Sequence, residues 1–332
     1  MSLKPKTLAK KQKVALFRNL VRADHYDKMM YRRMMQGKLI AFYHPGEGGL
    51  APGIAACTFL RDDDNLSPHH RAHGMGHMLS KGVDLRYYLA EHTGKEAGCC
   101  KARSSFHYSF PDKKIYMMSG FIGYNFAPSV GWGWAAKRRG KGQVVMNCSG
   151  DGSYGQGRAH EAMLMAMNWK LPIIFFCENN GMAIHSTVSE MHPTADIASL
   201  AKGFDMPAAV VDGQDLFGVA EIALAAIERA RTGEGPSFVE AKTYRFKEHD
   251  IGTPDLAGYT ERTDKEREEM RKRDPVVLAT ERVLAENIVS QAAIDKLHEE
   301  AAKEVEEAER FADESAIARP SEAELMAAVY AQ

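Results

Sequence analysis

Residues 143–180 read QVVMNCSGDGSYGQGRAHEAMLMAMNWKLPIIFFCENN, and this stretch decides the fold. Residues 143–148 and 171–177 are short apolar runs typical of buried strands, and residues 157–170 between them favour a helix. A strand, a crossover helix and a second strand predict a parallel pair. Two further strand-like runs, 208–211 and 237–241, flank a predicted helix at 215–232. This repeated pattern predicts an α/β fold with a mainly parallel, doubly wound sheet.

Helical segments are expected on both sides of this unit. Residues 14–36 carry apolar side chains at helical spacing, and Gly37 ends the pattern. Residues 261–273 and 289–312 are rich in Glu, Lys and Arg, which predicts solvated amphipathic helices packed on the sheet or on a partner. We therefore expect an N-terminal helical segment over residues 1–45, an α/β domain over 46–260 and a C-terminal helical extension over 261–332.

The composition argues against several classes of protein. The chain has 332 residues, and its 43 Lys+Arg against 44 Asp+Glu give a net charge of −1. This balance argues against a nucleic-acid partner bound by bulk electrostatics. No apolar run reaches the ~20 residues that a membrane helix needs, and no apolar segment typical of a signal peptide follows the basic start. Five cysteines without a C-x-x-C pattern fit a reducing, cytoplasmic compartment.

The glycine-rich turn at residues 150–155 matches two kinds of phosphate site. Its sequence GDGSYG fits G-x-G-x-x-G between a strand and a helix, and Glu178 ends the next strand, which together are typical of a dinucleotide site. Asp151, however, places a carboxylate where a pyrophosphate would bind, and the two anions repel unless a divalent cation lies between them. Asn180 follows the neighbouring strand, whose carboxyl end lies beside that of the first. We therefore favour Asp151, Asn180 and a backbone carbonyl as oxygen ligands of Mg²⁺.

The same residues resemble a known family. Gly150-Asp151-Gly152, then 26 residues, then Asn179-Asn180, is similar to the thiamine-diphosphate motif. The surrounding sequence resembles the α subunit of the decarboxylating component of 2-oxo acid and acetoin dehydrogenase complexes. The resemblance runs from about residue 20 to 280 and includes the segments HHRAHG, LAEHTG, VVDGQD and GPSFVEAKTYR in the family's order. It implies the thiamine-diphosphate-binding fold, in its diphosphate-binding module.

The resemblance also implies how thiamine diphosphate and Mg²⁺ would be held. Gly152 and Ser153 would offer backbone amides to the diphosphate at the start of a helix. Arg71 would donate to it as a bidentate partner, and His70, at the position where the family usually has Tyr, would be a further phosphate contact. Gly120 and Ile122 would hold the aminopyrimidine, with Ile122 as an apolar wedge. The implied ligands of Mg²⁺ are Asp151, Asn180 and the carbonyl of Met182.

Two histidines are expected to take part in catalysis. The resemblance places His249 in a mobile loop, where it would contact the diphosphate and assist acyl transfer to a lipoyl group. His73 is expected on a helix that also carries His69 and His77 at i, i+4 spacing. That spacing also occurs in zinc sites, but without a third ligand we favour hydrogen-bonding histidines around a substrate channel.

The chain contains one recognisable α/β module and no candidate for the glutamate that activates the cofactor. The resemblance places that glutamate on a separate β subunit, which implies an α₂β₂ heterotetramer and, as a further partner, a lipoyl acyltransferase. The expected activity is decarboxylation of a 2-oxo acid, with transfer of the acyl group to a lipoyl or equivalent acceptor. The alternatives are the α subunit of an acetoin-type acyloin dehydrogenase and a catalytically silent regulatory homologue.

Three segments depart from the family's pattern and leave the substrate open: Gly46–Gly49, Met117–Gly123 and Glu248–Asp250. Asp250 stands where animal members carry a regulatory phosphoserine, so that switch is expected to be absent. The residues expected to line the substrate pocket are Phe106, His107, Tyr108 and Phe121.

Overall fold

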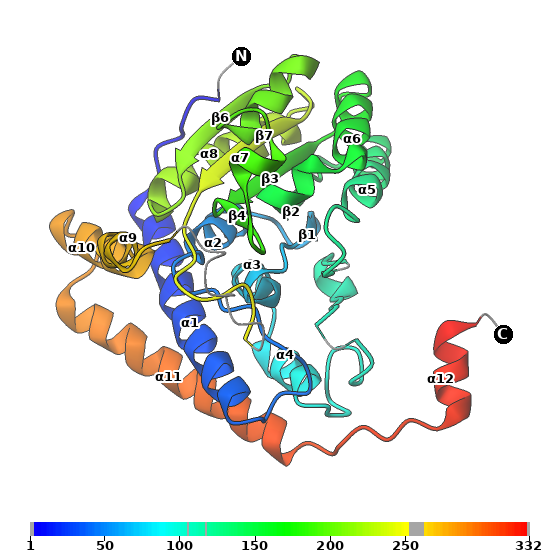
Figure 1. Cartoon of the computed structure of the whole chain (residues 1–332), viewed down its shortest axis with the longest axis vertical. Helices are drawn as coiled ribbons and strands as arrows, with labels where there is room; N and C mark the ends of the chain where they lie inside the picture. The colour runs from blue at the N-terminus through cyan, green and yellow to red at the C-terminus, as the bar shows by residue number, and fades with distance from the viewer. Residues whose placement is uncertain (1–2, 105, 117, 252–261, 331–332) are drawn as a thin grey trace.

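A computed structural model describes residues 3–104, 106–116, 118–251 and 262–330 of the chain. At its centre lies a five-stranded parallel sheet of order β1-β2-β3-β7-β6 (Figure 1). α6 (Gly157–Asn168) connects β2 to β3, and α8 (Leu216–Arg231) connects β6 to β7. The expected mainly parallel α/β sheet is confirmed. Its strands are β1 (Asn65–Ser67), β2 (Val145–Gly150), β3 (Ile173–Asn179), β6 (Ala208–Asp212) and β7 (Ser237–Lys242).

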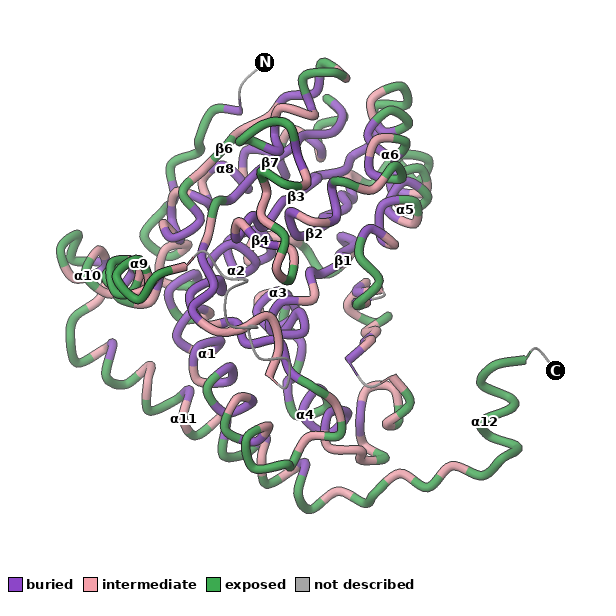
Figure 2. Tube along the Cα trace, viewed as in Figure 1, coloured by how far each residue is buried: buried purple, intermediate pink, exposed green. Residues whose placement is uncertain are grey.

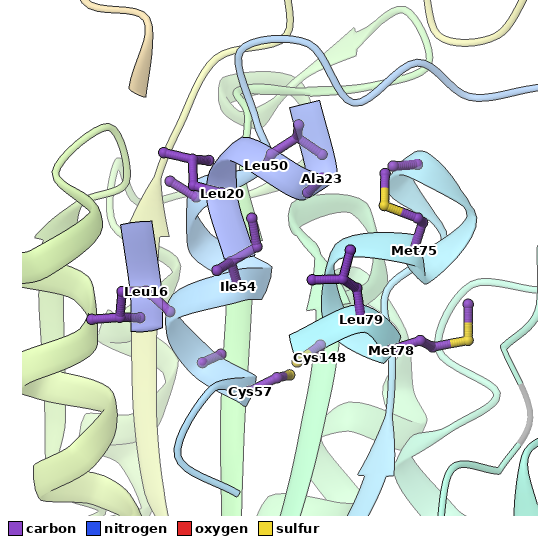
Figure 3. Close-up of a cluster of buried hydrophobic side chains, with 14 of the residues drawn as sticks. Leu16, Leu20, Ala23, Leu50, Ile54, Cys57, Met75, Met78, Leu79 and Cys148 are labelled. Atoms are coloured by element: carbon purple, nitrogen blue, oxygen red, sulfur yellow. The ribbon is translucent and has the colours of Figure 1, made fainter. Parts of the chain in front are cut away.

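Helices cover both faces of this sheet, as a doubly wound fold requires. Ile173 and Phe175 of β3 join one apolar cluster with α5 (Phe126–Arg139) and α6. Ile174 and Phe176 join the other, with α1 (Lys10–Met35), α2 (Ala51–Cys57), α3 (Met75–Ser80) and α8. Figure 3 shows α1, α2 and α3 meeting above β2 in this second cluster. Since both faces are buried, residues 173–177 of β3 form a continuous apolar run rather than an alternating one.

In the described residues, the C-terminal extension packs mainly on helices of the same chain, and Arg273 also pairs with Asp212 at the end of β6. Its helices are α9 (Asp264–Arg271), α10 (Pro275–Ala285) and α11 (Gln291–Glu314). α11 lies along α1 and α4 (Leu85–His92). Arg33 of α1 is buried there and pairs with Glu309, at 3.3 Å, and with Asp313. The dense charges of the extension therefore serve partly to join it to α1. The predicted domain boundary at 260/261 lies outside the described residues.

The last helix, α12 (Glu322–Val329), stands apart from the rest of the chain (Figure 1). The segment before it pairs with residues 94–96, where the Glu96 N–H donates to the Ala316 carbonyl at 2.9 Å. Figure 2 shows α12 exposed along its length. Its apolar side chains Leu325, Met326 and Val329 are 45–74% exposed and follow helical spacing. Across the described ranges, no helix has both the length and the apolar character to cross a membrane.

Residues 69–77 differ from the predicted helix. Arg71–Gly74 forms a 3-10 turn in which Ala72 and His73 have left-handed backbone angles, with φ of 48° and 47°. The Ala72 N–H donates to the carbonyl of His44 at 3.0 Å, so it cannot continue a helical ladder, and α3 begins only at Met75. His69 and His73 therefore do not share a helix face, and the predicted i, i+4 row of histidines is wrong.

A short hairpin follows β3 and completes the framework of the site. It consists of β4 (Met182–Ala183) and β5 (Ser186–Thr187), and α7 (Val188–Met191) follows it. The hairpin lies against the turn after β2, at the carboxyl ends of the central strands.

Candidate active site

A cavity of about 700 Å³ opens at the carboxyl ends of the strands. Its wall is built by the segments that follow β1, β2, β3 and β7, together with the segment before α2 and the loop before α5. Open α/β sheets bind ligands at this edge. The cavity brings together the predicted site residues other than His73, namely His70, Arg71, Gly120, Ile122, Asp151, Gly152, Ser153, Asn180, Met182 and His249.

Asp151 contributes an unpartnered carboxylate oxygen to the cavity wall. The residue is 2% exposed, and its Oδ2 is buried with no hydrogen-bond partner among the described residues. Burial raises the pKa of its carboxyl group, because the charged form loses its hydration. Asn180 and Met182 follow the neighbouring strand and line the same cavity. Carboxylate, amide and carbonyl oxygens suit Mg²⁺. The cation would also supply a positive charge to compensate the buried carboxylate of Asp151, so these residues fit the metal.

Gly152 and Ser153 lie in a 3-10 turn over Asp151–Gly155, whereas α6 begins at Gly157. The predicted start of the helix at residue 157 is confirmed, and the turn that carries Gly152 and Ser153 precedes it. The turn is fixed by Tyr154, whose fully buried ring contacts Phe126 and Phe238. Gln156 then adopts an extended conformation, which separates the turn from the helix.

Arg71 lies beside His249 in the cavity wall. Its Nη1 donates to the His249 carbonyl at 2.6 Å, and its Nη2 lies 3.3 Å from His249 Nδ1. The Nε of Arg71 is buried with no hydrogen-bond partner among the described residues. Burial and the neighbouring charge of Arg245 lower the pKa of Arg71 to about 10, so it stays cationic at neutral pH. Burial, and then Arg71, lower the pKa of His249 to about 3, so this imidazole is neutral. A cationic guanidinium over a buried cavity favours an anionic group such as a diphosphate.

Glu178 lies behind the cavity, between two histidines. Its Oε1 is 2.5 Å from His77 Nε2, and its Oε2 is 3.4 Å from His69 Nδ1; all three residues are buried. Although burial opposes ionisation, His77 and His69 hold the pKa of Glu178 below its usual range. Burial likewise opposes protonation of His77, but Glu178 raises its pKa. Because these contacts occupy both of its oxygens, Glu178 is not placed to bind the ribose that a dinucleotide site requires.

His73 lies behind the cavity wall, and His44 lies between His73 and the cavity. His73 is fully buried, and its Nε2 is 2.9 Å from Nδ1 of His44, which lines the cavity. Sequence reasoning missed His44. The one signal that could have found it is its position before Pro45-Gly46, at the start of a glycine-rich segment.

The three segments that depart from the family pattern occupy different places. Gly46 lies off the cavity, where its N–H donates to Asp27 at 2.7 Å. Gly120 and Asp250 line the cavity, whereas Met117 lies outside the described residues. Among the residues expected to line a substrate pocket, Phe106, His107 and Phe121 do so. Tyr108 does not line the cavity, because it is fully buried and its hydroxyl forms a hydrogen bond with Nε2 of His92.

Comparison with known proteins agrees with this geometry. The family model described as the dehydrogenase E1 component matches residues 19–321. The chain is 30% identical to the alpha subunit of acetoin:2,6-dichlorophenolindophenol oxidoreductase from Bacillus subtilis, over 98% of this chain and 95% of that protein. It is 32% identical to the chloroplastic pyruvate dehydrogenase E1 component subunit alpha-3 of Oryza sativa, over 97% and 76% of the two chains. It is also 32% identical to the somatic, mitochondrial pyruvate dehydrogenase E1 component subunit alpha of Homo sapiens, over 86% and 70%. The chain therefore belongs to the dehydrogenase E1 component family, whose members are oxidoreductases that use thiamine diphosphate.

Proposed function

We propose that this chain is the α subunit of a 2-oxo acid dehydrogenase that requires thiamine diphosphate and Mg²⁺. In this role it decarboxylates a 2-oxo acid and passes the acyl group to a lipoyl or equivalent acceptor. The observation that carries the proposal is the unpartnered oxygen of buried Asp151, in one cavity with Asn180, Met182 and the cationic Arg71. This set matches a metal-bridged diphosphate and not a dinucleotide.

Each residue of this set has a role in the proposed site. Asp151, Asn180 and the Met182 carbonyl would hold Mg²⁺, and Arg71 would neutralise the diphosphate together with the metal. His249, neutral and bound to Arg71, would contact the diphosphate and the incoming acceptor. Ile122 and Gly120 would hold the aminopyrimidine. When bound, thiamine diphosphate supplies the electron sink for cleavage of a bond next to a carbonyl.

A second chain would complete the site. The carboxylates that line the described part of the cavity belong to Asp151 and Asp250, and Asp151 is assigned to the metal. A β subunit would therefore bring the activating glutamate, in an α₂β₂ heterotetramer. Exposed apolar side chains at the cavity, with Phe121 at 78% and Ile122 at 42%, together with the apolar stripe of α12, would be covered by that assembly. A lipoyl acyltransferase as a further partner and a cytoplasmic location stay predictions.

Oxidation of an acyloin is the second candidate activity. It is favoured by the Bacillus subtilis relative, whose name states acetoin as its substrate and which this chain covers almost completely. Dye-linked assays separate the two activities. The co-expressed pair is given either a panel of 2-oxo acids or a panel of acyloins, and reduction of dichlorophenolindophenol is followed. The donor class with the higher kcat/KM is the substrate class.

The chain purified alone is expected to show less than about 1% of the turnover of the co-expressed pair, because the activating glutamate is absent. A missing general acid or base costs about a hundredfold or more. Dye reduction by both samples, at equal α-chain concentration with thiamine diphosphate and Mg²⁺, measures the ratio. Full activity of the isolated chain would refute the half-site proposal. Pair activity with NAD(H) in place of thiamine diphosphate would refute the cofactor assignment.

Gly152→Ala is expected to weaken cofactor binding by about tenfold or more. A Cβ at Gly152 would stand 2.5 Å from Cβ of Ala183, so β4 must move. The Met182 carbonyl moves with it, and small shifts of metal ligands cost about 10–100-fold in affinity. Calorimetric titration of the pair with thiamine diphosphate and Mg²⁺ measures the effect. Gly157→Ala, where a Cβ meets open space, is the matched control. Equal affinities of the two variants would contradict the role given to this turn.

A further inference from the structure

A row of three buried imidazoles runs from the cavity wall into the protein. Nδ1 of His44 lies 2.9 Å from Nε2 of His73, and Nδ1 of His73 lies 3.1 Å from Nε2 of His92. The hydroxyl of Tyr108 also meets Nε2 of His92. His44 lines the cavity, whereas the other members of the row are fully buried. The dehydrogenase function proposed above gives the residues of this row no role.

One backbone contact fixes the direction of these hydrogen bonds. The N–H of His44 donates to Nε2 of His73 at 3.2 Å, and a backbone donor cannot reverse. Nε2 of His73 is therefore the unprotonated nitrogen, and the neutral ring carries its proton on Nδ1, toward His92. Nδ1 of His44 faces the same lone pair at 2.9 Å, so it must be protonated as well, because two lone pairs at that distance repel.

This order leaves His44 with an unprotonated Nε2. Its Nδ1 is occupied by His73, so Nε2 is the nitrogen that can meet a ligand in the cavity. Burial, followed by the charge of Arg71, lowers the pKa of His44 well below its usual range and keeps the ring neutral. The ring thus presents a hydrogen-bond acceptor, in contrast to the cationic donor Arg71 on the same wall.

We propose that His44 is a specificity-determining residue that accepts a hydrogen bond from the hydroxyl of an α-hydroxy ketone substrate, with His73 and His92 as positioning residues. An α-hydroxy ketone has such a donor, whereas the ionised carboxylate of a 2-oxo acid presents lone pairs to the lone pair of Nε2. The proposal rests on the function proposed above, and it favours oxidation of an acyloin over decarboxylation of a 2-oxo acid.

Phenyl and imidazole rings surround His44 in the cavity wall. The rings of Phe42 and Phe106 lie 5.2 and 6.0 Å from the His44 ring, and both line the cavity. His107, which lines the same region, already uses both ring nitrogens. Its Nδ1 contacts the Ser104 carbonyl, and its Nε2 accepts from the Gly120 N–H. Of His107 and His44, His44 is therefore the one that keeps a ring nitrogen for a substrate hydroxyl, and His70 and His249 line the cavity with ring centroids 4.9 and 4.8 Å from that of His44.

The positioning role of His73 depends on its unusual backbone. Its left-handed φ of 47° turns the side chain away from the cavity and toward His44 and His92. Such a conformation is unfavourable for a residue other than glycine. The hydrogen bonds at both ring nitrogens offset that cost and hold the His44 tautomer.

The test uses the co-expressed pair with acetoin and 2-oxobutanoate as donors. We expect His44→Leu to lower kcat/KM for acetoin by about tenfold or more, as expected for loss of a buried hydrogen bond, mainly through KM. His44→Gln keeps an acceptor and should recover within about threefold. His92→Leu should lower kcat/KM for acetoin, and His92→Gln should restore it. His160→Leu on α6 is the control and should change neither donor. The affinity for thiamine diphosphate should stay within about twofold in all variants.

Nuclear magnetic resonance of the ¹⁵N-histidine-labelled, cofactor-free pair supplies a readout independent of turnover. The His44 signal, identified by its loss in His44→Gln, should show the Nδ1-protonated tautomer, and His92→Leu should change that tautomer ratio. An Nε2-protonated His44 overturns the inference. Equal losses for acetoin and 2-oxobutanoate in His44→Leu, or exclusive use of 2-oxo acids by the wild type, also overturn it. Turnover of neither donor by the wild type overturns the proposed function itself.

Discussion

Asp151→Asn is expected to abolish the stabilisation that thiamine diphosphate and Mg²⁺ give to the α/β pair, and at the same time to make the cofactor-free protein more stable. The two effects have one cause. Asp151 is 2% exposed and its Oδ2 has no hydrogen-bond partner among the described residues, so the cofactor-free fold carries a buried carboxylate that is only partly compensated by backbone N–H groups and by the charge of Arg245. Leaving such a group unsatisfied costs about 1–3 kcal/mol. An amide of the same shape removes the charge, and without that negative charge it would bind Mg²⁺ much more weakly than the carboxylate does.

The pH dependence of the cofactor-free protein follows from the same group. Burial raises the pKa of Asp151 in the folded state, so the folded state holds this proton more tightly than the unfolded state. The contribution of Asp151 to stability is therefore favourable at low pH. It is lost as pH rises from the unfolded value of about 3.9 through the raised folded value. The difference in unfolding free energy between Asp151→Asn and the wild type should grow over that interval and stay constant above it.

Thermal and denaturant unfolding of the pair, with and without cofactor, measure both effects. Wild type at a hundredfold excess of cofactor over Kd should gain about 2.7 kcal/mol, and Asp151→Asn should gain nothing. Asp112→Asn, at an exposed position, is the matched control and should behave as the wild type. A cofactor-free Asp151→Asn variant that is less stable than the wild type would show that Asp151 is stabilised by contacts other than a cation.

The sequence predicts the sheet and the diphosphate end of the site well, because both depend on local patterns. The runs at 143–148 and 171–177 and the spacing from Asp151 to Asn180 place two strand ends side by side. Once the strands are parallel, the ligands at their carboxyl ends meet without further information. The same logic brings Arg71 and His249 to this edge, after β1 and β7.

The positions of the histidines could not be predicted from local sequence patterns, because they depend on contacts between distant residues. The i, i+4 spacing of His69, His73 and His77 predicts one helix face, yet Ala72 and His73 turn left-handed, because the Ala72 N–H is taken by the carbonyl of His44, 28 positions earlier. A contact so distant in the chain leaves no trace in the periodicity. His69 and His77 instead share Glu178, which lies on β3. Likewise, the charged residues of α11 indicate an amphipathic helix, but Arg33 of α1 could not be predicted from them as an ion-pair partner.

Glu178→Gln is expected to lower the free energy of unfolding by about 3–5 kcal/mol near pH 5.5. Glu178 and His77 are a buried ion pair at 2.5 Å, and removing one partner leaves the other charge buried without compensation. Glu178 belongs to the central strand β3, so the cost cannot be relieved by moving a loop. Glu161→Gln, on the exposed face of α6, is the matched control and should lie within about 0.5 kcal/mol of the wild type.

The pH profile distinguishes this electrostatic cost from a loss of packing. The folded pKa of Glu178 is depressed, so its contribution is present above about pH 4.3 and is lost as pH falls toward the folded value. The folded pKa of His77 is raised, so its contribution is present below about pH 6.5 and is lost as pH rises through the folded value. The effect of Glu178→Gln should therefore be largest between about pH 4.3 and 6.5 and shrink as pH rises through the folded pKa of His77, where a hydrogen bond from a neutral imidazole to the carboxylate replaces the ion pair.

The double variant Glu178→Gln with His77→Gln separates the pair from its surroundings. With both charges removed, most of the lost stability should return, since two neutral amides can bond to each other where one unpaired imidazolium could not. Urea unfolding of the four proteins at pH 5.5 and 9 gives the coupling energy directly. A coupling energy near zero at pH 5.5 would mean that the pair contributes only shape.

His69, the other neighbour of Glu178, lines the cavity. The amide introduced by Glu178→Gln would hold His69 less firmly than the carboxylate does, so cofactor affinity should fall in this variant and should not recover in the double variant.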